Sequence, residues 1–91
     1  MIDAKEAVRI AFEYVQELYK PEEIPHLALE EVELSSDEGF WLVTVSFLKT
    51  VPKSPIEAMT GQHGTPTYKI LKIHAESGQV HSMKIRTMGL R

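Results

Sequence analysis

Four histidines are the residues in this chain whose side chains most readily bind a metal ion. His26 and His63 lie in segments that contain proline or glycine, whereas His74 and His81 flank a short turn. In the register expected for this turn, His74 and His81 point to opposite faces of a hairpin, and a shift of one residue would place them opposite each other. No carboxylate or third imidazole stands where it could complete a set of ligands. We therefore expect no metal site and no cofactor.

Side chains that could act as nucleophiles or as acid–base pairs lack the partners that catalysis needs. Thr44 and Ser46 lie in a predicted strand with no evident base beside them, and Ser54 is better explained as a helix cap. Glu30 and Glu31 are adjacent in a predicted strand, so they point to opposite faces and cannot act together as acid and base. We expect that the protein is not an enzyme.

The segment Thr67–Arg86 contains two stretches of alternating apolar and polar residues on either side of Glu76-Ser77-Gly78. This pattern predicts an antiparallel hairpin closed by a type I turn with a glycine bulge. The predicted register places Leu71 opposite Met83 and Ile73 opposite His81. One face, directed to a core, then carries Leu71, Ile73, Met83 and Ile85. The other face, directed to solvent or a partner, carries Tyr68, Ile70, Lys72, His74, Val80, Lys84 and Arg86.

A helix and two further strands precede this hairpin. Asp3 is typical of a helix cap, and apolar residues recur after it at helical spacing until Pro21 ends the helix. Leu27–Leu34 predicts a strand with a bulge or an edge position, and Phe40–Leu48 predicts a central strand. We expect the sheet side of the core to contain Trp41, Val43, Val45, Phe47, Leu71, Ile73, Met83 and Ile85. The expected helix side contains Val8, Ala11, Val15 and Leu18.

Together these elements predict an α+β fold: one N-terminal helix packed on a three- to four-stranded antiparallel sheet, in a single domain of residues 1–91. The segment Lys49–Pro66 does not have the pattern of a strand, because it contains three prolines and two glycines. We expect a long loop or lid there, with a short helical turn at Ser54-Pro55-Ile56-Glu57.

The net charge of -3 combines an acidic front part with a basic remainder. Residues 1–38 contain eleven acids and three bases, whereas the rest of the chain contains two acids and seven bases. The overall acidity argues against nucleic-acid binding, and the absence of cysteine excludes a disulfide framework. No apolar run is long enough to cross a bilayer and the amino-terminal residues do not resemble a signal peptide. We expect a cytoplasmic protein without membrane contact.

Another protein is the partner that the sequence favours. The outward side of the hairpin combines apolar groups with cations, which is typical of a partner site or a homodimer interface. Its candidate contact residues are Tyr68, Ile70, Lys72, Lys84 and Arg86. Ile56 and Met59 in the 49–66 segment either add to this contact or fold back to cap the core.

The chain also resembles PepSY-like domains. The resemblance rests on an Asp-Ala-Lys-Glu-Ala-Val helix, a strand that contains Trp41, and the hairpin from Tyr68 through Ile73-His74-Ala75-Glu76-Ser77-Gly78-Gln79-Val80. In that family an Asp-Ala-x-Thr-Gly-Glu-Val-like turn closes the final hairpin. Here His74 replaces the usual aspartate, Ser77 the threonine and Gln79 the glutamate. The plan is also similar to that of small cytosolic immunity-type proteins.

The resemblance implies a cystatin-like or PepSY-like half fold and a role in inhibiting or chaperoning a peptidase. We therefore expect a non-catalytic protein-binding module, immunity-like or inhibitor-like, with a homodimer as the simplest form. The alternative is a small-ligand-binding domain that uses the cleft between helix and sheet, with the 49–66 loop as its lid.

Overall fold

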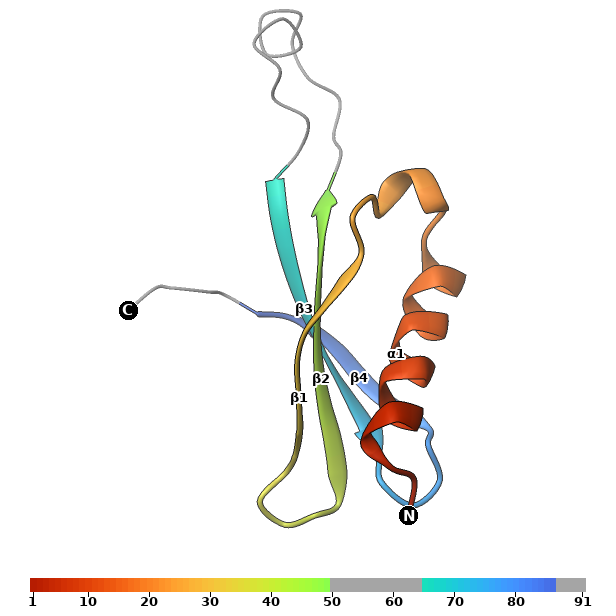
Figure 1. The fold of residues 1–91 in the computed structure, drawn as a ribbon, viewed down its shortest axis with the longest axis vertical. Coiled ribbons are helices and arrows are strands. Elements are labelled where there is room, and N and C mark those ends of the chain that lie inside the picture. Colours follow the sequence, from red (N-terminus) through yellow and green to blue (C-terminus); the bar gives the residue numbers. More distant parts are fainter. Residues whose placement is uncertain (50–64, 87–91) are drawn as a thin grey trace, which may run out of the picture.

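The computed structural model describes residues 1–49 and 65–86. The elements in chain order are α1 (Ala4–Leu18), the 3-10 turn η1 (Pro21–Glu23), β1 (Ala28–Leu34), β2 (Phe40–Lys49), β3 (Thr65–His74) and β4 (Val80–Ile85). The strands form one antiparallel sheet in the order β1-β2-β3-β4, and α1 packs against it (Figure 1). The predicted α+β fold is confirmed. No helix among the described residues is long and apolar enough to cross a membrane.

Helix α1 begins where the sequence predicts. The carboxylate of Asp3 accepts a hydrogen bond of 2.8 Å from the backbone N–H of Glu6, which satisfies one of the free donors at the helix start. The helix ends at Leu18, because Lys20 precedes Pro21 and is held in an extended conformation with ψ 150°. The small side chains of Ala7 and Ala11 allow the helix to approach the sheet closely, and both are fully buried.

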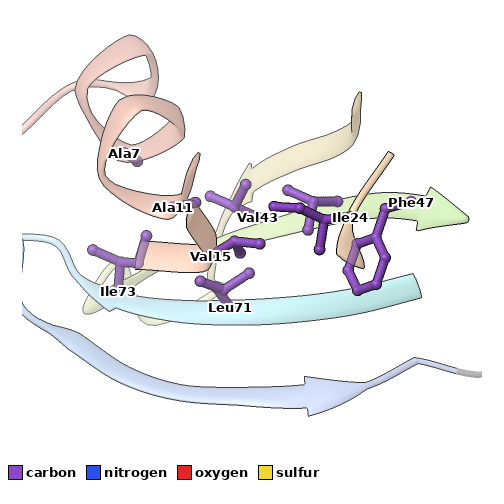
Figure 2. Close-up of a cluster of buried hydrophobic side chains, with 9 residues drawn as sticks. Ala7, Ala11, Val15, Ile24, Val43, Phe47, Leu71 and Ile73 are labelled. Atoms are coloured by element: carbon purple, nitrogen blue, oxygen red, sulfur yellow. The ribbon is translucent and has the colours of Figure 1, made fainter. Parts of the chain in front are cut away.

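The core lies between α1 and one face of the sheet (Figure 2). Its buried members on the strands are Val43, Val45, Phe47, Leu71 and Ile73, as predicted, and Trp41 and Met83 pack against them. Ala11 and Val15 are buried in the helix as predicted, and Val8 is half-buried. The predicted strand faces are therefore confirmed for β2 and for most of β3.

Two residues predicted to lie in the core do not. Ile85 is 73% exposed, because one helix about 10 Å across is narrower than four strands about 4.8 Å apart, and Ile85 lies at the end of an edge strand. Leu18 is 52% exposed. The segment that follows the helix covers this end of the core instead, with the Tyr19 ring 5.7 Å from that of Phe47 and Ile24 buried.

The hairpin of β3 and β4 differs from the prediction at its turn. Leu71 pairs with Met83 as predicted, but Ile73 pairs with Val80 rather than with His81. The turn is one residue longer than predicted: Gly78, at φ 78°, donates to the carbonyl of His74 at 2.8 Å. The register shift between Lys72 and Ile73 then leaves His81 as an additional residue in β4. As a result Val80 packs against the core, contrary to the prediction.

Of two further predictions about the strands, one is confirmed and one is wrong in part. The predicted bulge in the first strand is confirmed, since the register of β1 and β2 shifts between Leu29 and Glu31. The prediction that no part of Lys49–Pro66 is a strand is wrong at both ends, where Lys49 pairs with Thr65 and Leu48 with Pro66. The rest of the predicted loop or lid lies outside the described residues.

The amino-terminal residues are tied to the sheet. The backbone N–H of Ile2 donates to the carbonyl of Ala75 at 2.8 Å, and the indole Nε1 of Trp41 donates to the carbonyl of Ile2 at 3.0 Å. Ile2 also lies close to the turn glycine, Gly78. These contacts fix the start of α1 at the end of the sheet where β3 turns into β4 (Figure 1).

Candidate protein-binding surface

The side of the sheet that faces away from α1 is here called the outer face. Because paired residues in antiparallel strands point to the same side, the register identifies its members. From β2 these are Phe40, Leu42, Thr44, Ser46 and Leu48, and from β3 they are Tyr68, Ile70, Lys72 and His74. From β4 and the residue after it they are Ser82, Lys84 and Arg86, and from β1 they are Ala28, Glu31 and Glu33. No described helix or strand covers this face (Figure 1).

Five of the predicted contact residues lie together on the outer face. Tyr68, Ile70 and Lys72 are half-buried in β3, and Lys84 is exposed in β4. Arg86 follows β4, and its backbone N–H donates to the carbonyl of Tyr68 at 2.9 Å. The structure therefore gathers these residues as the hairpin pattern predicted. Ile56 and Met59, the other predicted contact residues, lie outside the described residues.

Arg86 is the residue that organises the centre of this face. Its Nη1 donates to the hydroxyl of Thr44 at 2.7 Å and also pairs with the carboxylate of Glu31. The side chain thus extends from the end of β4 across β3 to β2 and β1. Thr44 is only 1% exposed, and this bond gives its buried hydroxyl a partner. The alternation pattern did not reveal this contact, because it joins residues on non-adjacent strands.

The acidic and the basic residues of the outer face come from different strands. The acids belong to β1 and are Glu30, Glu31 and Glu33, whereas the residues of β2 on this face are uncharged. The cations, Lys72, Lys84 and Arg86, belong to β3, to β4 and to the residue after β4. Glu30 accepts from the hydroxyl of Ser46 at 2.6 Å. Glu33 and Lys84 make no ion pair with any described residue.

Two of the histidines meet at the turn end of this face, contrary to the predicted opposite orientation. The ring centroids of His74 and His81 are 5.2 Å apart, and each lies near the ring of Phe40, at 4.8 Å and 5.3 Å. The ammonium of Lys72 lies 4.5 Å from the centre of the Phe40 ring. The bulge at His81 is what turns the two imidazoles to the same side. No group of three or more potential ligands for a metal ion occurs among the described residues.

An apolar groove of about 720 Å³ runs between α1 and β1 on the opposite side of the sheet. Its apolar walls are formed by Ala4, Val8, Phe12, Leu29 and Val32, and its rim along the helix by Lys5, Arg9, Glu13 and Gln16. The groove exists because α1 does not cover β1 completely, and Leu29 is 43% exposed there. Phe12 is the sequence signal that could have indicated this groove, because it is an apolar residue outside the central apolar stripe of the helix.

The charge of Arg9 on the groove rim is neutralised within the helix. Its guanidinium bonds to Glu6 and, at 2.6 Å, to Glu13. The hydrogen bond from Arg9 lowers the pKa of the Glu6 carboxyl, and its charge adds to this effect. The bonds to the two carboxylates raise the pKa of Arg9. Lys5, in contrast, has no ion-pair partner in the part of the chain that the structure describes.

Comparison with known proteins adds no relative to this description. No family model, curated protein or solved structure matches the chain.

Proposed function

We propose that the chain is a non-catalytic protein-binding module and that the outer face of its sheet is the binding surface. The observation that carries the proposal is a sheet face without a described covering element, whose centre holds Tyr68, Ile70 and Arg86. Tyrosine and arginine are over-represented among the residues that dominate protein interfaces. Apolar groups rimmed by charge are typical of such surfaces.

The hydroxyl groups of the outer face support a binding role rather than a catalytic one. Thr44 accepts from Arg86 and is buried, and the hydroxyl of Ser46 donates to Glu30. No histidine is bonded to either hydroxyl among the described residues, and the Glu30 carboxylate beside Ser46 has no described group that orients it as a catalytic base would require. We therefore propose that these groups stabilise the surface.

The proposal also includes the kind of binding protein and its location in the cell. An immunity-like or inhibitor-like role agrees with the resemblance of the final hairpin to PepSY-like domains, and a cytoplasmic location agrees with the lack of cysteine. The protein bound would then lie against β2, β3 and β4 rather than against the helix.

A site-specific crosslink tests the proposal. A photoreactive p-benzoylphenylalanine is placed at position 68 on the outer face, or at position 17, which is exposed on the far side of α1. Irradiation in the host cells should join a protein to the chain from position 68 and not from position 17. Equal yields from both positions, or no protein adduct from position 68, would overturn the proposal.

The groove between α1 and β1 favours a second candidate, a small-ligand-binding domain. Its volume of about 720 Å³ lies within the range of ligand sites, and its walls are apolar. In a thermal-shift screen of small apolar ligands, a bound ligand should raise the Tm of the wild type and not that of Leu29→Lys. The lid expected for this function falls in the 49–66 segment, most of which lies outside the described residues.

A further inference from the structure

We propose that the partner of the outer face is a second copy of this chain. In this dimer the two sheets pack face to face about a two-fold axis that runs parallel to the strands. This inference rests on the proposed function, since it names the protein that the outer face binds. It follows from the order of charges across the sheet, and it fixes which strands meet.

When the order of residues across the sheet is reversed, acidic positions meet basic ones. One row of neighbours on the outer face, taken from β1 to β4, is Glu31, Thr44, Ile70 and Lys84. The row therefore starts with an acid, ends with a base and has two uncharged residues between them. Of the other charges, Glu30 and Glu33 lie on β1 at the same edge as Glu31. The ammonium of Lys72 lies over Phe40 of β2, and the guanidinium of Arg86 already pairs with Glu31 in its own chain, so Lys84 is the free cation at the opposite edge among the described residues.

A two-fold axis can relate two stacked sheets in two simple ways. If the axis lies across the strands, β1 of one copy covers β1 of the other, and acids face acids. If it lies along the strands, the strand order is reversed across the interface, so that β1 covers β4. Each acidic edge then meets the basic edge of the other copy. Like charges placed opposite each other cost free energy, so the charge order selects the second arrangement.

The uncharged residues fit the same arrangement. With the axis between β2 and β3, Ile70 of one copy lies over the position of Thr44 in the other, where the side chain of Arg86 covers the threonine. Tyr68 packs beside them. Packed sheets cross at about 30°. This angle shifts each edge strand along the strand that it covers by roughly half the distance between two successive residues on the same face. Lys84 then lies within reach of both Glu31 and Glu33 in the other copy. Arg86 remains free to hold Thr44 and Glu31 within its own chain.

The size of the face sets the concentrations that a test must cover. Four strands about 4.8 Å apart and about seven residues long, at about 3.3 Å per residue, form a face of about 19 by 23 Å. Two such faces amount to about 900 Å² in total, below the roughly 1,200 Å² at which stable interfaces begin and typical of weak, transient contacts. We expect a reversible dimer that is populated at micromolar concentrations and above.

Reversing the charge of one residue on β1 and of one residue on β4 tests the inference. Glu33 and Lys84 are the residues to change, because neither pairs with a described residue, whereas Glu31 already holds Arg86. Sedimentation equilibrium over a range of concentrations is measured for the wild type, Glu33→Lys, Lys84→Glu and the double variant. Glu17→Lys, which makes the same charge change on the exposed side of α1, is the control.

The wild type and Glu17→Lys should dimerise equally. Glu33→Lys and Lys84→Glu should each raise the dimer Kd by roughly tenfold or more, because both copies then place like charges together. An equimolar mixture of the two single variants should dimerise as well as the wild type, and so should the double variant. Circular dichroism of each variant verifies that the fold is kept.

The outcomes separate this inference from the proposed function. A wild type that stays monomeric at every concentration overturns the second copy as partner, while an adduct with a different protein from position 68 keeps the proposed function. Single variants that are not rescued in the mixture overturn the axis along the strands. Loss of dimerisation in Glu17→Lys alone would move the interface to the helix side and overturn both.

Discussion

The guanidinium of Arg86 donates a hydrogen bond of 2.7 Å to the hydroxyl of Thr44, although β3 lies between the strands of these residues. The same group pairs with Glu31 on β1. One side chain therefore connects the two ends of the sheet across its outer face. This explains why Thr44 is buried on a face that no described element covers.

Thr44→Val tests this connection, because valine keeps the shape of threonine and removes the hydroxyl. We expect a loss of about 1–2 kcal/mol in the free energy of unfolding, because the donor of this hydrogen bond is a charged guanidinium. Arg86 is partly exposed and keeps Glu31, so the loss should not exceed this range. Urea unfolding measures it, with Ser82→Ala on the same face as the control. A loss in Ser82→Ala as large as that in Thr44→Val would contradict a specific role for Thr44.

Phe47→Ala should destabilise the protein by about 3–5 kcal/mol, as expected when a large buried side chain is removed from a core. Phe47 is 4% exposed and its ring contacts that of Tyr19. Ile85 lies on the same face of the sheet as Phe47 but is exposed. Ile85→Ala should therefore change the free energy of unfolding by less than about 0.5 kcal/mol. Chemical denaturation compares the two, and equal losses would show that the end of β4 is covered.

Gly78→Ala should destabilise the hairpin by about 1–2 kcal/mol, because Gly78 has a φ of 78° that alanine adopts only with strain. A Cβ atom there would also lie 3.0 Å from Cδ1 of Ile10. Gly78→Asn introduces the same Cβ atom but tolerates positive φ better, so it should cost less than alanine. Thermal unfolding of both variants separates strain from contact. Equal losses would assign the whole effect to Ile10.

The turn between β1 and β2 predicts a pH effect. A hydrogen bond of 2.6 Å from the Ser35 hydroxyl, followed by one from the Gly39 N–H, lowers the pKa of the Asp37 carboxyl. Since the folded pKa is lowered, the stabilisation is complete above the unfolded pKa of this group. It is lost as the pH falls through the folded pKa. Ser35→Ala should therefore raise the pKa of Asp37 and weaken the dependence of stability on acid pH.

An NMR titration of the Asp37 carboxyl carbon measures this pKa. Ser36→Ala is the matched control, since Ser36 lies in the same turn and is exposed. The Ser36 variant should leave the Asp37 titration unchanged. If both variants raised the pKa equally, the turn conformation rather than the Ser35 hydroxyl would be responsible.

Most of the fold could be predicted because local patterns determine it. Alternation in β2 placed Val43, Val45 and Phe47 on the core side, and Asp3 marked the start of α1. The interruption of alternation in β1 also marked its bulge. These features depend on neighbours in the sequence, so periodicity and capping chemistry are sufficient to find them.

The features that could not be predicted depend on geometry between distant residues. Whether His74 and His81 meet is decided by a single additional residue in β4, and alternation cannot reveal it because one residue shifts the whole register. The exposure of Ile85 depends on the width of the helix relative to the sheet. The hairpin pattern was sufficient to place Tyr68, Ile70 and Lys84 on one face. The bond from Arg86 to Thr44 could not be predicted in this way, because it depends on which strands lie next to the hairpin.

The attachment of Ile2 has a consequence for folding kinetics. Trp41 is the only tryptophan, and its indole hydrogen bond joins residues 39 positions apart, while the strands themselves pair only with the strands next in the chain. Intrinsic fluorescence in a stopped-flow experiment would therefore follow the docking of the amino-terminal segment. Far-UV circular dichroism would follow the hairpins. Comparing the two signals would time closure of this long loop separately from assembly of the meander.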